Sequence, residues 1–391
     1  MILRLLPILG ITFIDILGFS ILIPLMPFFV EHFGAPPIVV GTLFAVFALC
    51  QLVAGPVWGN ISDRIGRKAV LIVSQIGATI GWTMLALAPN LGIVFLARII
   101  EGLSGGNMSV TQAYVADVVE PEKRARAFAL IGASFSLGLI FGPAAGGWLA
   151  GHFGFSAPFL LAAGLQLVTL VVTVAVLPES RQTGAISETA GVREIVKSLR
   201  DPRLAPTMWQ KLVYSFGLYG WFAAFTLVLQ AQLGLTQETA SYFFAAFGVV
   251  SVVMQLGVVG RITDLLGDRQ TSNLGLAAVF GSLVIAPFIH DLRLAFVMLV
   301  LFSFGLSINN ATLPALITEV TPENQRGSIL GVASSLESAS GIVMPPISTG
   351  AFGLYGVGAT AAISAAFTVA ALAMGLLQSR RPASAVSSRL R

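Results

Sequence analysis

The stretch "GNISDRIGRKAV", residues 59–70, places four charged side chains between two long apolar runs. They are Asp63, Arg64, Arg67 and Lys68, in a chain of 391 residues of which only 10% are charged. Hydrophobic residues make up 56% of the chain, which is too many for a water-soluble surface to enclose. The charged stretch is therefore predicted to be a short loop at a membrane surface, between two membrane-spanning segments.

Apolar segments of about twenty residues recur along the chain, and each could cross roughly 30 Å of hydrocarbon as an α-helix. They are apolar on nearly every face, whereas β-barrel strands alternate polar and apolar residues. The sequence thus predicts an all-α polytopic membrane protein with twelve transmembrane helices. The predicted spans are 5–30, 38–60, 69–89, 91–118, 124–151, 156–177, 206–231, 239–262, 271–289, 294–318, 327–350 and 358–378.

Basic residues are distributed unevenly between the predicted loops. If the amino terminus is cytoplasmic, Arg293 is the only Lys or Arg in an outside loop. Because basic loops resist translocation, we expect a multi-pass protein of the plasma (inner) membrane with both termini cytoplasmic. The net charge of +4 then lies next to anionic lipid, so the lipid bilayer, and no nucleic acid, is the expected partner.

An internal repeat divides the chain, because a shift of 201 residues matches its two halves in two distant loops. The shift pairs "VEPE" at 119–122 with "VTPE" at 320–323, and it pairs Gly59, Asp63 and Gly66 with Gly260, Asp264 and Gly267. Such a duplication is typical of transporters. We expect two pseudo-symmetric six-helix bundles, 1–177 and 206–391, the second with a short cytoplasmic tail, joined by a cytoplasmic linker, 178–205. A monomer would suffice for a path between the bundles.

Four motifs resemble those of the major facilitator superfamily, over essentially the full length of the chain. "GNISDRIGRK" is similar to that family's signature between helices two and three, and "FLARIIEGLSGG", 95–106, to the helix-four motif of its proton-coupled members. "GLIFGPAAGGWLAG", 138–151, and "IDILGFSILIPLMP", 14–27, are similar to helices five and one of its twelve-helix drug/proton antiporters. The first 180 residues look most like the tetracycline/proton antiporter group, although Gly81 stands where that group has an acid.

The resemblance implies efflux of small amphipathic or lipophilic compounds, multidrug or tetracycline-like, in exchange for protons by rocker-switch alternating access. Two alternatives stay open: a proton-coupled carrier of a metabolite or sugar, and a non-transporting membrane receptor or scaffold. No enzyme is predicted, because no nucleophile motif such as G-x-S-x-G occurs. With Cys50 as the single cysteine, neither a cysteine metal site nor a cofactor is predicted.

In the family that the chain resembles, the charged loop acts as a conformational latch at the cytoplasmic face. Asp63 and Arg67 lie four residues apart at a helix end, where they can pair, and Asp117 is the nearest further partner for Arg67. The alternative is that the basic residues only fix topology. The candidate latch residues are Gly59, Asp63, Gly66, Arg67, Lys68 and Asp117.

A charged side chain near the middle of a membrane-spanning helix costs roughly 2.5 to 3.5 kcal/mol on insertion scales, and four candidates of this kind stand out. They are the candidates for proton coupling: Asp15, Arg98, Glu101 and Glu337. A carboxylate in apolar surroundings can bind and release a proton near neutral pH, although Asp15 could instead tether helices. Arg98 can pair with Glu101 or hold a nearby acid ionised. Glu337 is either a second acidic site or a neutral packing acid.

The helix-five motif combines a kink with small residues, since Pro143 removes a backbone donor. Its candidate residues are Gly138, Gly142, Pro143, Gly146 and Gly147. The resemblance implies a hinge or seal between the halves, and helix packing alone is the alternative.

In this fold, helices one, four, seven and ten line the cavity. The substrate-cavity candidates there are Phe19, Asn107, Gln112, Tyr114, Tyr214, Tyr219, Asn309 and Asn310. A cavity that is mostly apolar and aromatic suits lipophilic cations better than sugars.

Overall fold

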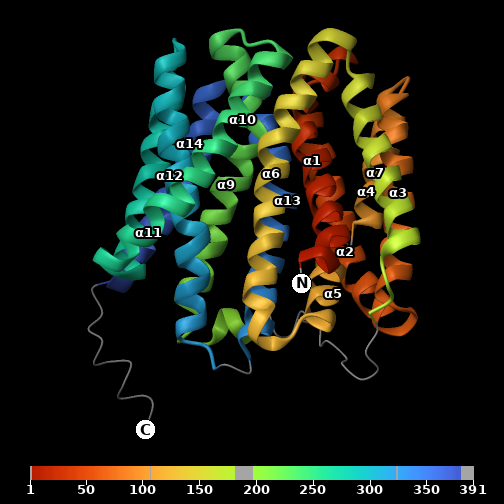
Figure 1. Cartoon of the computed structure of the whole chain (residues 1–391). Coiled ribbons are helices and arrows are strands. Elements are labelled where there is room, and N and C mark those ends of the chain that lie inside the picture. Colours follow the sequence, from red (N-terminus) through yellow and green to blue (C-terminus); the bar gives the residue numbers. More distant parts are fainter. Residues whose placement is uncertain (1, 106, 181–196, 323–324, 380–391) are drawn as a thin grey trace. The chain divides into compact units, whose positions relative to one another are not determined.

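A computed structural model of the chain describes residues 2–105, 107–180, 197–322 and 325–379 (Figure 1). Helices dominate these residues, which contain no β-strand. Ten helical segments in the described ranges are long and apolar enough to cross a membrane. The all-α prediction is confirmed. The predicted linker lies partly outside the described residues, as does most of the predicted tail.

Contacts divide the chain into two compact units, which are described separately. The first unit contains α1 (Ile2–His32), α2 (Ile38–Ile65), α3 (Arg67–Ala86), α4 (Leu91–Ser104), α5 (Asn107–Val118), α6 (Pro121–Phe153) and α7 (Ser156–Val176). It also contains Gly234–Gly248, which includes the first part of α10 (Gln237–Met254). The second unit contains the rest of α10, α9 (Ala205–Leu233), η1 (Gln255–Val259), α11 (Gly260–Ile285), η2 (Ala286–Phe288), α12 (Leu292–Glu319), α13 (Arg326–Tyr355) and α14 (Val357–Ser379).

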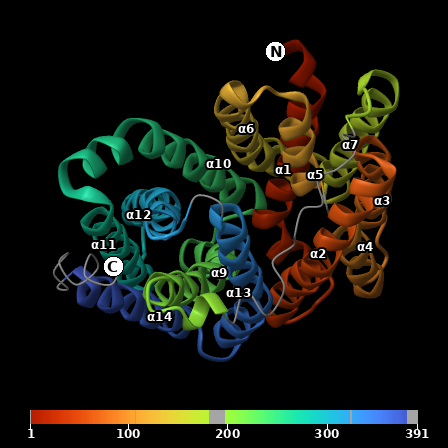
Figure 2. The same ribbon diagram turned by 90° about the horizontal axis from the view of Figure 1, so that it is seen from below.

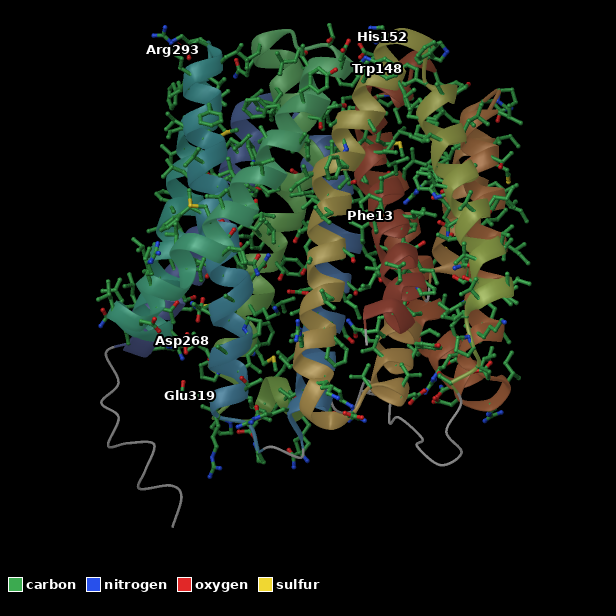
Figure 3. The ribbon with its side chains drawn as sticks, viewed as in Figure 1. Phe13, Trp148, His152, Asp268, Arg293 and Glu319 are labelled. Atoms are coloured by element: carbon green, nitrogen blue, oxygen red, sulfur yellow. The ribbon has the colours of Figure 1, made fainter. Side chains whose placement is uncertain are left out.

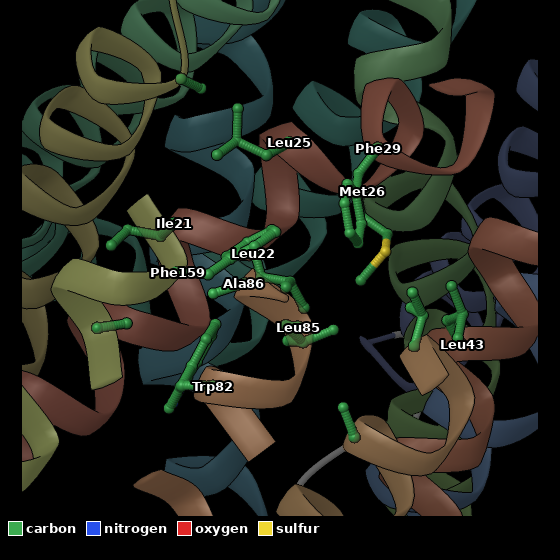
Figure 4. Packing of buried hydrophobic residues seen from close by; sticks show 14 of the residues in the cluster. Ile21, Leu22, Leu25, Met26, Phe29, Leu43, Trp82, Leu85, Ala86 and Phe159 are labelled. Atoms are coloured by element: carbon green, nitrogen blue, oxygen red, sulfur yellow. The ribbon is translucent and has the colours of Figure 1, made fainter. Parts of the chain in front are cut away.

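The core of the first unit forms where α1 packs against α3 and α7. Leu22 of α1, Trp82 of α3 and Phe159 of α7 belong to one buried cluster, shown in Figure 4. The rings of Trp82 and Phe159 have centroids 6.2 Å apart. Gly18 permits the close approach of α1, because a Cβ there would lie 2.9 Å from the Trp82 ring.

Helix α6 lies directly against α1 along a face of three glycines, Gly138, Gly142 and Gly146. A Cβ at Gly142 would lie 2.5 Å from the Leu17 carbonyl oxygen, so the two backbones are nearly in contact. The hydroxyl of Ser20 donates a hydrogen bond to the Gly138 carbonyl oxygen at 2.8 Å. Small residues thus allow helix contact in a medium where the hydrophobic effect does not drive association.

The helix-five motif has a second packing face, which the sequence analysis did not separate from the first. Gly147 packs against Ser241 of α10, and a Cβ at Gly151 would lie 2.6 Å from Glu238 Oε2. Gln237 donates a hydrogen bond from Nε2 to the Ala150 carbonyl oxygen at 2.8 Å. Consecutive residues of a helix differ by about 100° in direction, so neighbouring glycines serve different partners.

The predicted span 91–118 is not one helix. It ends as α4 at Ser104 and restarts as α5 at Asn107, and Gly105 has non-helical angles of φ −76° and ψ 75°. Two carbonyl oxygens at the end of α4 find side-chain donors instead: Trp58 Nε1 donates to Leu103 at 2.6 Å, and the Ser74 hydroxyl donates to Ser104. The break is stable because buried side chains replace the lost helical hydrogen bonds.

Helical structure extends over Gln237–Phe288, which contains the predicted spans 239–262 and 271–289. It is interrupted at Gly267, whose φ of 76° and ψ of 159° place a kink between two helices inside α11. The two predicted spans are therefore separate helices joined at that kink, and the loop expected between them is shorter than predicted.

The repeat is visible in the backbone. Every residue with positive φ in the described chain is a glycine, and the six glycines form three pairs spaced by 200, 201 and 202 residues: Gly34 with Gly234, Gly66 with Gly267, and Gly154 with Gly356. Helix caps repeat as well, since Asn90 accepts from the Ile93 N–H and Asp291 accepts from the Leu294 N–H. These equivalent turns support the duplication that the 201-residue shift indicated.

In the second unit, α9 packs against α13 and α14, as Figure 2 shows. Met208, Ile317 and Ala333 are part of its buried cluster. Figure 3 places Asp268 and Glu319 at one end of this unit and Arg293 at the opposite end. The amide of Leu294 lowers the pKa of Asp291 at that end by donating to its carboxylate.

Replacement of Gly142 by Ala is expected to separate α1 from α6, because the Leu17 backbone cannot give way to the new methyl group. The cost of such overpacking is about 1 to 3 kcal/mol, so the Tm of the purified protein in detergent should fall. Gly132→Ala on the same helix is the matched control, since a Cβ there meets nothing within 4 Å. Equal Tm values for the two variants would contradict close α1–α6 packing.

Candidate functional site

Arg67 joins three helices of the first unit at the charged loop. Its guanidinium lies 2.5 Å from the Asp63 carboxylate of α2 and 3.2 Å from the Asp117 carboxylate of α5. It also donates to the Ser62 hydroxyl at 2.5 Å. The structure therefore brings together the pair and the further partner that the sequence suggested. We call Asp63, Arg67, Lys68, Asp117 and Glu179 the Arg67 cluster.

Glu179, which follows α7, is a member that the sequence analysis missed. One carboxylate oxygen accepts from the backbone N–H of Arg67 at 2.8 Å, and it therefore caps the N-terminus of α3. Lys68 donates to the Val174 carbonyl oxygen of α7 at 2.8 Å. An acid directly after a predicted span was the available signal, but its distance of more than 100 residues from Arg67 hid the contact.

The two glycines of the signature lie in different surroundings. Gly66 has φ 108°, and a Cβ there would collide with the Glu179 carboxylate. Gly59, in contrast, lies within α2, and a Cβ there would meet nothing within 4 Å. The contact with Glu179 therefore requires a glycine at position 66, whereas the packing around Gly59 does not require one.

The repeat counterpart of this cluster uses neutral partners. Arg269 of α11 donates to Gln378 of α14 at 2.6 Å and to Gln210 of α9 at 3.3 Å. Asp264, the counterpart of Asp63, is exposed. At this loop the second unit thus binds its arginine through amide oxygens, where the first unit uses carboxylates.

The second group of predicted residues surrounds Arg98, in the middle of α4. Its guanidinium is buried, forms an ion pair with Glu101 and lies 4.2 Å from the centre of the Phe47 ring. Phe47 in turn stacks on Phe19 of α1, with centroids 6.1 Å apart. Within the described residues, Arg98 Nε and Nη2 and Glu101 Oε1 have no hydrogen-bond partner. We call Phe19, Phe47, Arg98 and Glu101 the Arg98 cluster.

Gly81 of α3 makes room for this ion pair. A Cβ at Gly81 would collide with the Glu101 side chain and would lie 3.3 Å from the Ala97 carbonyl oxygen. Residue 81 is where the sequence departs from the tetracycline/proton antiporters by lacking an acid. In the structure the Glu101 side chain from α4 fills the space next to that glycine.

Asp15 of α1 is half-buried and faces α7. Gln166, a buried residue of α7, donates from Nε2 to Asp15 Oδ1 at 3.0 Å. Gln166 carries no charge, so this contact is a hydrogen bond and not an ion pair. Sequence reasoning missed Gln166, because an isolated glutamine in a span carries no motif.

Glu337 of α13 pairs with a lysine that the sequence analysis overlooked. Lys211 Nζ of α9 lies 2.6 Å from Glu337 Oε1. A basic residue inside the predicted span 206–231 was a signal in itself. Whether Glu337 is a second acidic site or a packing acid stays a prediction, and in both readings Lys211 is its partner.

The substrate-cavity candidates differ in burial and in their hydrogen-bond partners. Tyr114 is buried and donates to the Pro178 carbonyl oxygen, and Asn309 is buried and accepts from Ser272. Those contacts favour packing roles. Gln112 and Asn310 are exposed, Tyr214 is buried, Tyr219 is half-buried, and the side chain of Asn107 lies outside the described residues.

The connection between α5 and α6 carries a charged pair. Lys123 donates to Glu120 at 2.6 Å, and this hydrogen bond lowers the pKa of Glu120.

In the described part of the chain, no three His, Cys, Asp or Glu residues come close enough to hold a metal ion.

Long apolar helices, buried ion pairs and a duplicated half define a multi-pass membrane transporter. The family model of the Major Facilitator Superfamily matches residues 8–345 and, in an overlapping match, 212–391. The chain belongs to this superfamily, whose members carry small molecules across membranes.

Characterised relatives are drug-resistance proteins. The chain is 31% identical over 342 residues to the tetracycline resistance protein, class B, of Escherichia coli, covering 86% of this chain and 85% of that one. It is 28% identical over 349 residues to multidrug resistance protein 2 of Bacillus subtilis (strain 168), covering 86% and 85%.

Solved structures share the fold at low identity. The nucleoside transporter NupG matches with a TM-score of 0.81 at 11% identity, covering 96% of this chain and 99% of that one. A bacterial homolog of the human lysosomal transporter Spinster, in an inward-facing and unoccupied conformation, matches with a TM-score of 0.77 at 15% identity, covering 96% and 94%. At these identities the likeness concerns the fold alone.

Replacement of Gly81 by Ala is expected to displace Glu101 and to lower the free energy of unfolding by about 1 to 3 kcal/mol. The Tm should fall accordingly. Gly164→Ala in α7 is the control, because a Cβ there meets nothing within 4 Å. In a Glu101→Ala background the same Gly81 substitution should cost less, and a double-mutant cycle measures this coupling. Additive effects would show that residues 81 and 101 do not interact.

Proposed function

We propose that the protein exports small amphipathic or lipophilic compounds, of the multidrug or tetracycline-like kind, in exchange for protons. The observation that carries the proposal is the pair of acids inside the helices of the first unit, Asp15 and Glu101, which contact Gln166 and Arg98. The names of two relatives, which refer to tetracycline and multidrug resistance, support the substrate class. The expected organisation is a monomer of two six-helix bundles with both termini cytoplasmic.

Proton coupling is assigned to Asp15 and to the Arg98 cluster. A buried ion pair is costly to break, about 3 to 5 kcal/mol when one partner is removed, so protonation of Glu101 would force Arg98 to find another acceptor. The unused donors Nε and Nη2 of Arg98 make such an exchange possible. Asp15 accepts a hydrogen bond from Gln166 and is the second proposed site of proton uptake.

The Arg67 cluster is proposed as the conformational latch. It ties α2, α3, α5 and the segment after α7 together through charged contacts near the membrane surface. Charge-assisted hydrogen bonds contribute about 1.5 to 3 kcal/mol, enough to bias a two-state equilibrium by tenfold or more. All of these residues belong to the first unit, so during rocker-switch alternation of the two halves the cluster would act by holding the cytoplasmic ends of these helices together. The two-face packing of α6 supports its role as a hinge.

The proposal is tested by efflux from inverted vesicles with an imposed proton gradient. The panel contains a cationic, a neutral and a tetracycline-like compound, and a protonophore serves as the control for coupling. Gradient-dependent accumulation of at least one compound is expected. Absence of any gradient-dependent signal would favour the metabolite carrier or the scaffold.

Asp15→Asn is expected to lower gradient-driven transport at least tenfold while substrate counterflow without a gradient stays within about threefold. An asparagine keeps an oxygen for the Gln166 hydrogen bond but cannot carry the proton. Both rates are measured in the same proteoliposomes, so counterflow reports correct folding. Gradient-driven transport at the wild-type rate would remove Asp15 from the coupling mechanism.

Asp63→Asn is expected to insert and fold, and to transport about tenfold more slowly, because Arg67 loses one of its two carboxylates. Asp264→Asn, at the equivalent position of the second half, is the matched control and should transport normally, since Asp264 is exposed. Transport rates are compared at equal amounts of protein in the membrane. Normal transport by the Asp63 variant would leave only a topological role for the loop.

A further inference from the structure

The Lys211–Glu337 pair lies inside the helices of the second unit. Lys211 is six residues from the start of α9 and Glu337 eleven from the start of α13, which is about 9 Å and about 16 Å along the axes. The ammonium and carboxylate are 2.6 Å apart. Together they are neutral, so the pair can stay inside the membrane without a ligand.

The two members of the pair are unequally accessible. The Lys211 side chain is 9% exposed, whereas the Glu337 side chain is 34% exposed. A molecule that approaches the pair therefore meets the carboxylate first. Glu337 Oε1 contacts Lys211, and a carboxylate has a second oxygen with which to accept hydrogen bonds.

Two tyrosines of α9 accompany the pair. Tyr214 and Tyr219 both interact electrostatically with Glu337. Tyr214 is 3% exposed, and its hydroxyl has no hydrogen-bond partner among the described residues. A buried hydroxyl without a partner costs about 1 to 3 kcal/mol, so a group that binds there would recover that cost.

We propose that Glu337, positioned by Lys211, binds the cationic nitrogen of a substrate, with Tyr214 and Tyr219 flanking it. This inference rests on the proposed transport function and names the group that recognises positive charge. The carboxylate supplies the counter-charge, and the ring of Tyr219, which is less buried than that of Tyr214, supplies an aromatic face that attracts cations. Lys211 is a positioning residue that keeps the empty site neutral and limits its attraction for cations. An anionic substrate is disfavoured, because it would have to displace Glu337 to reach the less accessible ammonium.

The charges predict opposite effects of two substitutions. Glu337→Gln leaves Lys211 without its acid, so a cation is repelled. Lys211→Met leaves Glu337 without its ammonium, so a cation is attracted more strongly. A role of the pair in packing alone predicts no difference between charged and neutral substrates.

The probes are ethidium, which is permanently cationic, and Nile red, which is neutral. Apparent KM values are measured by counterflow in proteoliposomes without a proton gradient, so that coupling does not enter. Glu337→Gln should raise the KM for ethidium at least tenfold relative to that for Nile red. Lys211→Met should lower the same ratio at least threefold. Glu319→Gln and Lys197→Met, which each remove one exposed charge of the same sign, should leave the ratio unchanged.

The outcomes separate this inference from the proposed function. A wild-type protein that transports neither probe contradicts the transport proposal. Transport with an unchanged KM ratio in both variants overturns the cation site alone. Loss of gradient-driven transport of both probes, with normal counterflow, would instead make Glu337 a coupling acid and also overturn it. If one single variant does not fold, the double variant Glu337→Gln with Lys211→Met restores neutrality and should still raise the ratio.

Discussion

A hydrocarbon environment leaves a polar group no water to bind, so every partner must come from the protein. This constraint explains the contacts of charged side chains in mid-helix: Arg98 with Glu101, Lys211 with Glu337, and Asp15 with Gln166. It also explains the backbone, because Trp58 and Ser74 donate to the carbonyl oxygens released where α4 ends. A transporter gains from the same constraint, since each partner exchange has a large energetic effect and can select between conformations.

The two halves repeat the same turns of the backbone, but their side chains at the equivalent stretch after the second helix differ. At the loop after α2, Arg67 binds the carboxylates of Asp63 and Asp117. At the equivalent stretch of α11, Arg269 donates to the amide oxygens of Gln210 and Gln378. The first stretch therefore joins its helices through ion pairs, and the second joins α9, α11 and α14 through hydrogen bonds between a charged and a neutral side chain.

The sequence was sufficient for the features that depend on local pattern. Apolar length predicted the helices, four-residue spacing predicted the Asp63–Arg67 pair, and proximity to a predicted helix end suggested Asp117. It could not supply contacts that depend on how helices pack. Glu179, Gln166 and Lys211 carry no motif, and only the fold brings them to Arg67, Asp15 and Glu337. The break at Gly105 was also hidden, because its cost is met by side chains from α2 and α3.

The three pairs of glycines with positive φ are evidence for the internal repeat. Side chains at matched positions have diverged, as Arg67 and Asp268 show, because many residues fit a helix surface. A backbone with positive φ accepts few replacements, since a β-carbon there adds roughly 1 to 2 kcal/mol of strain. The matched turns thus support a duplication of one helical unit, because turning points of this kind would preserve the register of the original copy after its chemistry has changed.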